Sequence, residues 1–145
     1  ADLYLAYAEA CVETGDLTTA KTYLNKVRQR AGIPDVETSW ARVGATLDQA
    51  KLRQIVRQER MAEFYLQCQN FWDMRRWMLA EQYFGTKAKG LNINATNMTN
   101  FAELHEIQYE RKFEAPTQYL LPIPIDEINK NPRLVNNPGY TGDHR

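Results

Sequence analysis

Apolar residues recur at steps of three and four near the start of the chain, which is the spacing of one face of an α-helix. The pattern predicts a helix over about residues 3–14 and a second over 17–31. Gly15 and Asp16 separate them, because glycine readily ends a helix and aspartate readily caps the next. Pro34 follows the second helix, which proline cannot continue. The two stripes are Leu3, Tyr4, Tyr7, Ala8, Cys11 and Val12, then Leu17, Ala20, Tyr23, Leu24, Val27 and Ala31. They predict two antiparallel helices.

This helical hairpin, residues 1–34, resembles a tetratricopeptide repeat, with small Ala8 and Ala20 in its helices and Gly15 at its turn. A single repeat leaves both flanks uncovered, so we expect it to pack against further repeats that precede this chain. A tetratricopeptide-type protein-interaction module, which binds a peptide in its groove, is therefore one possible function.

A third helix is predicted over about residues 47–66, after a polar connection at 35–46. Its apolar stripe begins at Leu52, Ile55 and Val56. The same step then reaches Glu59 and Glu63, which would turn two carboxylates toward the interior. Such carboxylates need partners, because a buried unpaired charge is costly.

A very apolar helix is predicted over residues 70–84, packed as a pair with the preceding helix. Charged residues interrupt it, and we expect Arg75 or Arg76, or Arg60 of the preceding helix, to pair with the two glutamates.

Glu59 and Glu63 also have the separation, about 6 Å between their stems, that paired catalytic carboxylates of glycosidases use. The flanking arginines would hold both carboxylates ionised, however, which suits a salt bridge better than a proton donor. The pattern therefore favours a structural role and leaves a glycosidase as the weaker alternative.

The periodicity fades over residues 85–106, which indicates an asparagine-rich surface loop. Alternating residues at 107–113, followed by 119–121, predict a short β-hairpin. The chain then ends in an extended tail with a helical turn at 126–130. Apolar anchors along this tail are Leu120, Ile123, Ile125, Ile128, Leu134 and Tyr140. The fold class is thus all-α (α-rich), with a short β-hairpin and an extended C-terminal tail.

Composition narrows the function further. The 145 residues include 18 Lys+Arg and 18 Asp+Glu, so the chain lacks the excess positive charge of a nucleic-acid binder. No apolar run approaches the ~20 residues needed to span a bilayer. Residues 1–9 lack the basic flank and apolar core of a signal peptide. We expect no nucleic-acid partner, and no membrane contact through these residues.

Chemically reactive residues are few. Cys11 and Cys68 lie far apart within apolar patterns and are expected to be buried thiols. His105 is expected on a loop surface and His144 in a frayed terminus, and neither has a recognisable partner. No GxSxG, GxGxxG or Walker loop occurs. We predict no catalytic residue, metal site or cofactor.

Aromatic residues could provide flat faces for stacking on sugar rings. Trp72 and Trp77 lie in the apolar helix and are expected in the core. Trp40 and Tyr109, in loop or edge positions, are the better candidates for exposure.

Two segments resemble the hallmark helix pair of the SusD/RagB family: residues 52–64, LRQIVRQERMAEF, and residues 70–77, NFWDMRRW. The ending is similar too, with YLLPIP at 119–124, EINKNP at 127–132 and NNPGY at 136–140. The helical hairpin at 1–34 stands where the family has its last repeat. One departure is residues 67–70, QCQN, where relatives commonly have Glu-Gly-x-Arg.

The resemblance implies a non-catalytic glycan-binding component of a bacterial outer-membrane uptake system. Family members are surface-exposed lipoproteins of Bacteroidetes-type bacteria that cap a SusC-like TonB-dependent transporter and bind poly- or oligosaccharides without cleaving them. This chain would be the C-terminal scaffold, with residues 35–145 forming one structural unit with 1–34. It would lack the signal peptide, lipid anchor and upstream repeats. The family's sugar-contacting aromatics lie largely in other segments, so no carbohydrate-binding residue is assigned.

Overall fold

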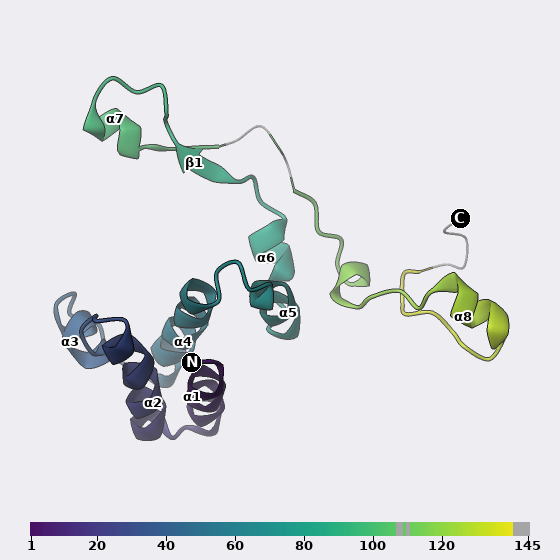
Figure 1. The fold of residues 1–145 in the computed structure, drawn as a ribbon, viewed down its shortest axis with the longest axis horizontal. Helices are drawn as coiled ribbons and strands as arrows, with labels where there is room; N and C mark the ends of the chain where they lie inside the picture. The colour runs from purple at the N-terminus through teal and green to yellow at the C-terminus, as the bar shows by residue number, and fades with distance from the viewer. Residues whose placement is uncertain (107–108, 110, 141–145) are drawn as a thin grey trace. The chain divides into compact units, whose positions relative to one another are not determined.

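The structure, a computed structural model, describes residues 1–106, 109 and 111–140 (Figure 1). The chain divides into two compact units, Ala1–Asn70 and Phe71–Arg145, and each is described by itself. Our division into a hairpin at 1–34 and a region at 35–145 that forms one structural unit with it stays a prediction.

The first unit begins with the expected helical hairpin. Helix α1 spans Asp2–Thr14 and helix α2 spans Leu17–Arg30. Gly15 between them has φ +85°, a left-handed conformation that glycine adopts without strain. The carboxylate of Asp16 accepts a hydrogen bond from the Thr19 amide at 3.1 Å and caps α2. The predicted break and cap are therefore both confirmed.

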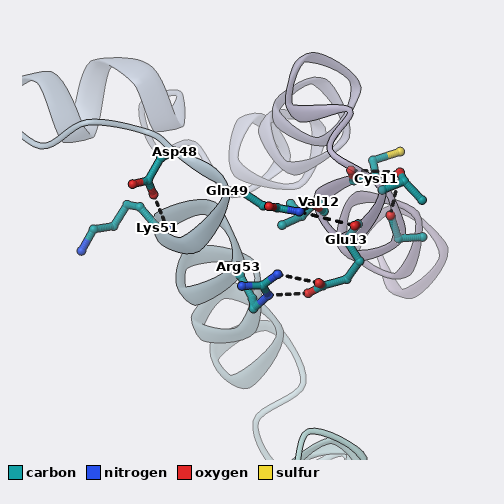
Figure 2. A network of polar contacts seen from close by, with 9 residues as sticks. Cys11, Val12, Glu13, Asp48, Gln49, Lys51 and Arg53 are labelled. Atoms are coloured by element: carbon teal, nitrogen blue, oxygen red, sulfur yellow. Dashed lines mark hydrogen bonds and ion pairs between the residues drawn. The ribbon is translucent and has the colours of Figure 1, made fainter.

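Two more helices complete the first unit. Helix α3, Val36–Ala41, lies within the segment expected to be a polar connection, because Val36 is buried and fixes this turn against the core. Helix α4, Gln49–Glu63, is capped by the Asp48 carboxylate, which accepts from the Lys51 amide at 2.7 Å (Figure 2).

The core of the first unit lies among α1, α2 and α4. Leu5, which the predicted stripe omitted, is fully buried, whereas Leu3 is 82% exposed. The inward face of α1 thus starts two residues later than predicted and leaves Tyr4 and Tyr7 on its flank. The buried apolar side chains of this core are Leu5, Ala8, Cys11, Val12, Ala20, Leu24, Val27, Val36, Leu52, Ile55, Val56 and Phe64.

The apolar segment predicted as one helix over 70–84 is two helices. Helix α5 is Gln69–Arg76 and helix α6 is Ala80–Phe84. The chain reverses at Met78, whose φ is +56°, and the Leu79 amide donates to the Met74 carbonyl at 2.9 Å. This backward bond ends α5 in the manner of a Schellman turn.

The β-hairpin lies earlier in the chain than predicted. Strands β1 (Lys89–Leu91) and β2 (Leu104–Glu106) pair antiparallel, and helix α7 (Met98–Ala102) occupies the connection between them. Residues 85–106, which were expected to form a loop, therefore contain both strands.

The two segments expected to be strands differ from the prediction. Residues 107, 108 and 110 lie outside the described residues, and 111–113 form no strand. Thr117–Tyr119 forms a 3-10 turn, η1.

The C-terminal tail is extended, as predicted, and the helical turn expected at 126–130 is confirmed as helix α8, Ile125–Lys130. Asparagine side chains join the two extended stretches of the tail, which precede and follow α8. Asn136 accepts from the Ile123 amide at 2.9 Å, and Asn137 donates to the Leu121 carbonyl at 2.6 Å. These bonds satisfy backbone N–H and C=O groups that an extended segment outside a sheet would leave without a protein partner.

Within the part of the chain that the structure describes, no helix has the length and apolarity needed to cross a membrane.

Candidate functional site

Glu59 and Glu63 on α4 are engaged in ion pairs within the first unit. Glu59 pairs with Arg28 of α2, and Glu63 pairs with Arg30 of the same helix. The buried Arg28 side chain also donates to the Pro34 carbonyl at 2.8 Å. These contacts tie α4 to the end of α2.

The arginines expected to pair with these glutamates have other partners. Arg60 lies 3.3 Å from a carboxylate oxygen of Asp2. Arg75 donates to backbone carbonyls, and Arg76 lies 2.8 Å from Asp73. The predicted partners were wrong because the pairing depends on how α2 packs against α4, which local spacing does not reveal.

Glu59 and Glu63, the two carboxylates of the glycosidase alternative, each have an arginine partner on α2. The arrangement favours the structural interpretation of Glu59 and Glu63.

The N-terminal half of α4 is joined to the C-terminal end of α1 (Figure 2). Arg53 donates to both carboxylate oxygens of Glu13, with both N–O distances at 2.6 Å. These hydrogen bonds lower the pKa of Glu13 below its ordinary value, although partial burial opposes them. The side-chain amide of Gln49 donates to the Val12 carbonyl at 2.7 Å, which also accepts from the Gly15 backbone N–H at 3.2 Å.

Cys11, Cys68 and His105, the cysteines and histidine that the structure describes, do not lie together in a reactive or metal-binding group. Cys11 is buried as predicted, but Cys68 is exposed because α4 ends five residues before it. His105 is exposed on β2, with Glu103 at 3.9 Å, and His144 lies outside the described residues. Among residues 1–106, 109 and 111–140, no group of three or more His, Cys, Asp or Glu side chains could hold a metal ion.

The exposure of the aromatic residues differs from the prediction at Trp40, Trp72 and Trp77, and Trp77, which was expected in the core, is only partly buried. Trp40 packs against the core of the first unit, because α3 brings it there. Trp72 is 53% exposed, because the buried face of α5 is formed by Asp73 and Met74. Tyr109 is 72% exposed, as expected. Of the four aromatic residues weighed from the sequence, Trp72 and Tyr109 are thus the ones exposed enough for a sugar ring to stack on.

Trp72 lines an open cavity of about 550 Å³ in the second unit. The other lining residues are Arg75, Arg76, Met78, Tyr119, Leu120 and Leu121. Sequence reasoning missed this site because its two sides lie more than forty residues apart and the predicted helix buried Trp72. The consecutive apolar Leu120 and Leu121, both exposed, were the available signal.

Comparison with known proteins gives consistent matches along the chain. A family model described as the SusD family matches residues 1–140. SusD-like protein P2 of Formosa agariphila is 28% identical over 142 residues, covering 97% of this chain and 25% of that protein. A SusD-like protein of Bacteroides ovatus is 30% identical over 166 residues, covering 95% of this chain and 28% of that protein.

The fold has matches among solved structures as well. The crystal structure of a SusD-like protein from Bacteroides fragilis aligns with a TM-score of 0.76 and 34% identity. The alignment covers 96% of this chain and 24% of that one. This chain therefore spans about a quarter of the length of the relatives it matches.

Proposed function

Because this chain belongs to the SusD family, we propose that it forms the C-terminal part of a protein that binds glycans for uptake across a bacterial outer membrane. SusD-like proteins are generally glycan-binding proteins of the outer membrane. The family match over residues 1–140 is the observation that carries the proposal.

Within that protein, the first unit acts as scaffold. Its helices α1, α2 and α4 enclose one apolar core, and ion pairs fasten α4 at both ends. A rigid element of this kind suits the positioning of sugar-binding loops that other segments supply. The exposed flank of α1, Leu3, Tyr4 and Tyr7, gives preceding repeats an apolar surface to cover.

The protein binds glycan without cleaving it. SusD-like relatives are binding proteins. The pairing of Glu59 and Glu63 with arginines supports the same conclusion for this chain, because it gives both carboxylates a structural role.

The full protein works at the cell surface beside a SusC-like TonB-dependent transporter, held by a lipid at its N-terminus. The support for this partner and location is family membership. No residue of this chain is assigned to the transporter interface.

Affinity electrophoresis against a polysaccharide panel tests the proposal, with the full-length protein and the 145-residue chain run side by side. Retardation of the full-length protein by at least one glycan is expected. Retardation of the shorter chain as well would place a glycan site within these residues. A full-length protein that no glycan retards would contradict the proposal.

A tetratricopeptide-type interaction module is the second candidate, favoured by the same exposed flank of α1. It predicts that the full-length protein binds a peptide segment and no glycan, so the electrophoresis panel separates the two.

A further inference from the structure

The cavity beside Trp72 combines an aromatic wall with a fixed positive charge. Its walls come from two segments of the second unit, residues 72–78 and 119–121. The Trp72 ring meets the Phe71 ring edge to face, with centroids 4.9 Å apart. Leu120 and Leu121 expose about half of their side chains at the other wall. A ring-shaped ligand with apolar faces would fit between these walls.

Arg75 is held in place by the backbone on both sides. Its Nε donates to the Gln118 carbonyl at 3.1 Å, and its Nη1 donates to the Phe71 carbonyl at 3.0 Å. The guanidinium also lies 3.6 Å from the centroid of the Phe71 ring. Its orientation is therefore fixed before any ligand arrives, which lowers the entropic cost of binding.

The Arg75 guanidinium has N–H groups that these two hydrogen bonds do not use. Of its five N–H groups, the two bonds above use one on Nε and one on Nη1. Nη2 makes no hydrogen bond to any residue that the structure describes. A planar group with paired donors matches the two oxygens of a carboxylate or sulfate.

The charge of the residues that line the cavity also favours an anionic ligand. Among the described residues that line the cavity, the ionised side chains are Arg75 and Arg76, both positive, and none is a carboxylate. Asp73 lies 2.8 Å from Arg76 and offsets its charge. The charge of Arg75 is left to attract an anion.

We infer that this cavity is a subsite for an anionic sugar residue, with the sugar ring against Trp72 and its carboxylate or sulfate on Arg75. The inference rests on the proposed glycan-binding function and specifies its substrate class as acidic glycans. A uronate and a sulfated sugar share the chemistry that Arg75 recognises, so the experiment includes both.

Calorimetry on the full-length protein tests the inference with two matched pairs of ligands. Oligogalacturonate is compared with its methyl ester, and sulfated dextran oligosaccharide is compared with unmodified dextran oligosaccharide. We expect one charged member to bind at least tenfold more tightly than its neutral counterpart. Which pair shows the difference identifies carboxylate or sulfate as the recognised group.

Variants connect the binding to the cavity. R75K keeps the charge but loses the paired donors, and W72A removes the ring, so each is expected to weaken binding of the charged ligand about tenfold. W72F keeps a flat ring and is expected to retain most of the affinity. The control variants are R133Q and Y65A, at exposed positions outside the cavity, and both should bind as the wild type does.

The outcomes separate this inference from the proposed function. Binding of neutral glycans alone, or unchanged affinity in folded R75K and W72A, would overturn the anionic subsite and leave glycan capture intact. Binding of no glycan by the wild type would overturn both. If R75K does not fold, W72A and W72F still decide the role of the aromatic wall.

Discussion

Arg28 and Glu59 form an ion pair between helices α2 and α4, with the guanidinium buried at the edge of the core. Arg28 also donates to the Ser39 hydroxyl at 2.8 Å. One side chain thus connects α2, α3 and α4, and loss of its carboxylate partner leaves a buried charge without compensation.

We therefore expect Glu59→Gln to lower the free energy of unfolding by about 3 kcal/mol. Glu63→Gln is the matched control, because its partner Arg30 is 62% exposed, and we expect a loss of about 0.5 kcal/mol. Urea denaturation followed by circular dichroism measures both. Equal, small losses would show that the buried pair does not stabilise the fold, and hydrolysis of a glycan that depends on Glu59 would revive the glycosidase alternative.

Cys68 occupies a left-handed backbone conformation, with φ +60°. A non-glycine residue pays a steric cost there that glycine does not. Because Cys68 is exposed, we expect Cys68→Gly to raise the free energy of unfolding by about 0.5–1 kcal/mol.

The matched control is Gln67→Gly, one residue earlier, where φ is not positive. This change should lower the free energy of unfolding, because glycine only adds freedom to the unfolded chain. Thermal denaturation of both variants measures the difference, and a destabilising Cys68→Gly would show that the thiol contributes more than the strain costs.

Glu13 makes stability depend on pH. Hydrogen bonds from Arg53 hold the pKa of Glu13 below its ordinary value of 4.5 in the folded chain. The unfolded chain then binds the proton more readily, so the pair's contribution is complete above about pH 5 and is lost as pH falls through the folded pKa.

The difference in unfolding free energy between wild type and Glu13→Gln should therefore be largest near pH 7 and shrink toward about pH 3. The effect is small and should weaken in about 1 M salt, because the pair lies at the surface. Urea titrations at these two pH values measure it, and a difference that does not change with pH would contradict the assignment.

Gly139 fixes the tail against the turn η1. Its φ is +89°, and a Cβ added there would overlap the side chain of Thr117. We expect Gly139→Ala to release the tail, so that amide protection at Ile123 and proteolytic resistance of residues 131–140 both fall. Exposed Val135→Ala is the control and should change neither. An unaltered exchange pattern in Gly139→Ala would show that the tail tolerates the added methyl group.

The sequence predicted the elements whose signals are local. Gly15 and Asp16 marked the turn of the first hairpin, where Gly15 ends α1 and Asp16 caps α2. These predictions succeeded because each depends on the preference of one or two residues for a backbone conformation.

The errors arose where the fold depends on distant contacts. The break at Met78 contains no glycine or proline, and the three-residue strands β1 and β2 are too short to show an alternating pattern. The arginine partners of Glu59 and Glu63 lie about thirty residues away. The cavity beside Trp72 was missed for the same reason, because its second wall is supplied by residues 119–121.

Calorimetric titration of the full-length protein with the glycan that retards it most, followed by chromatography of the recovered glycan, tests the central claim most directly. The account predicts saturable binding and recovery of the glycan at its original length. Absence of binding across the panel, or recovery of shortened products, would contradict a glycan-binding protein that captures its ligand without cleaving it.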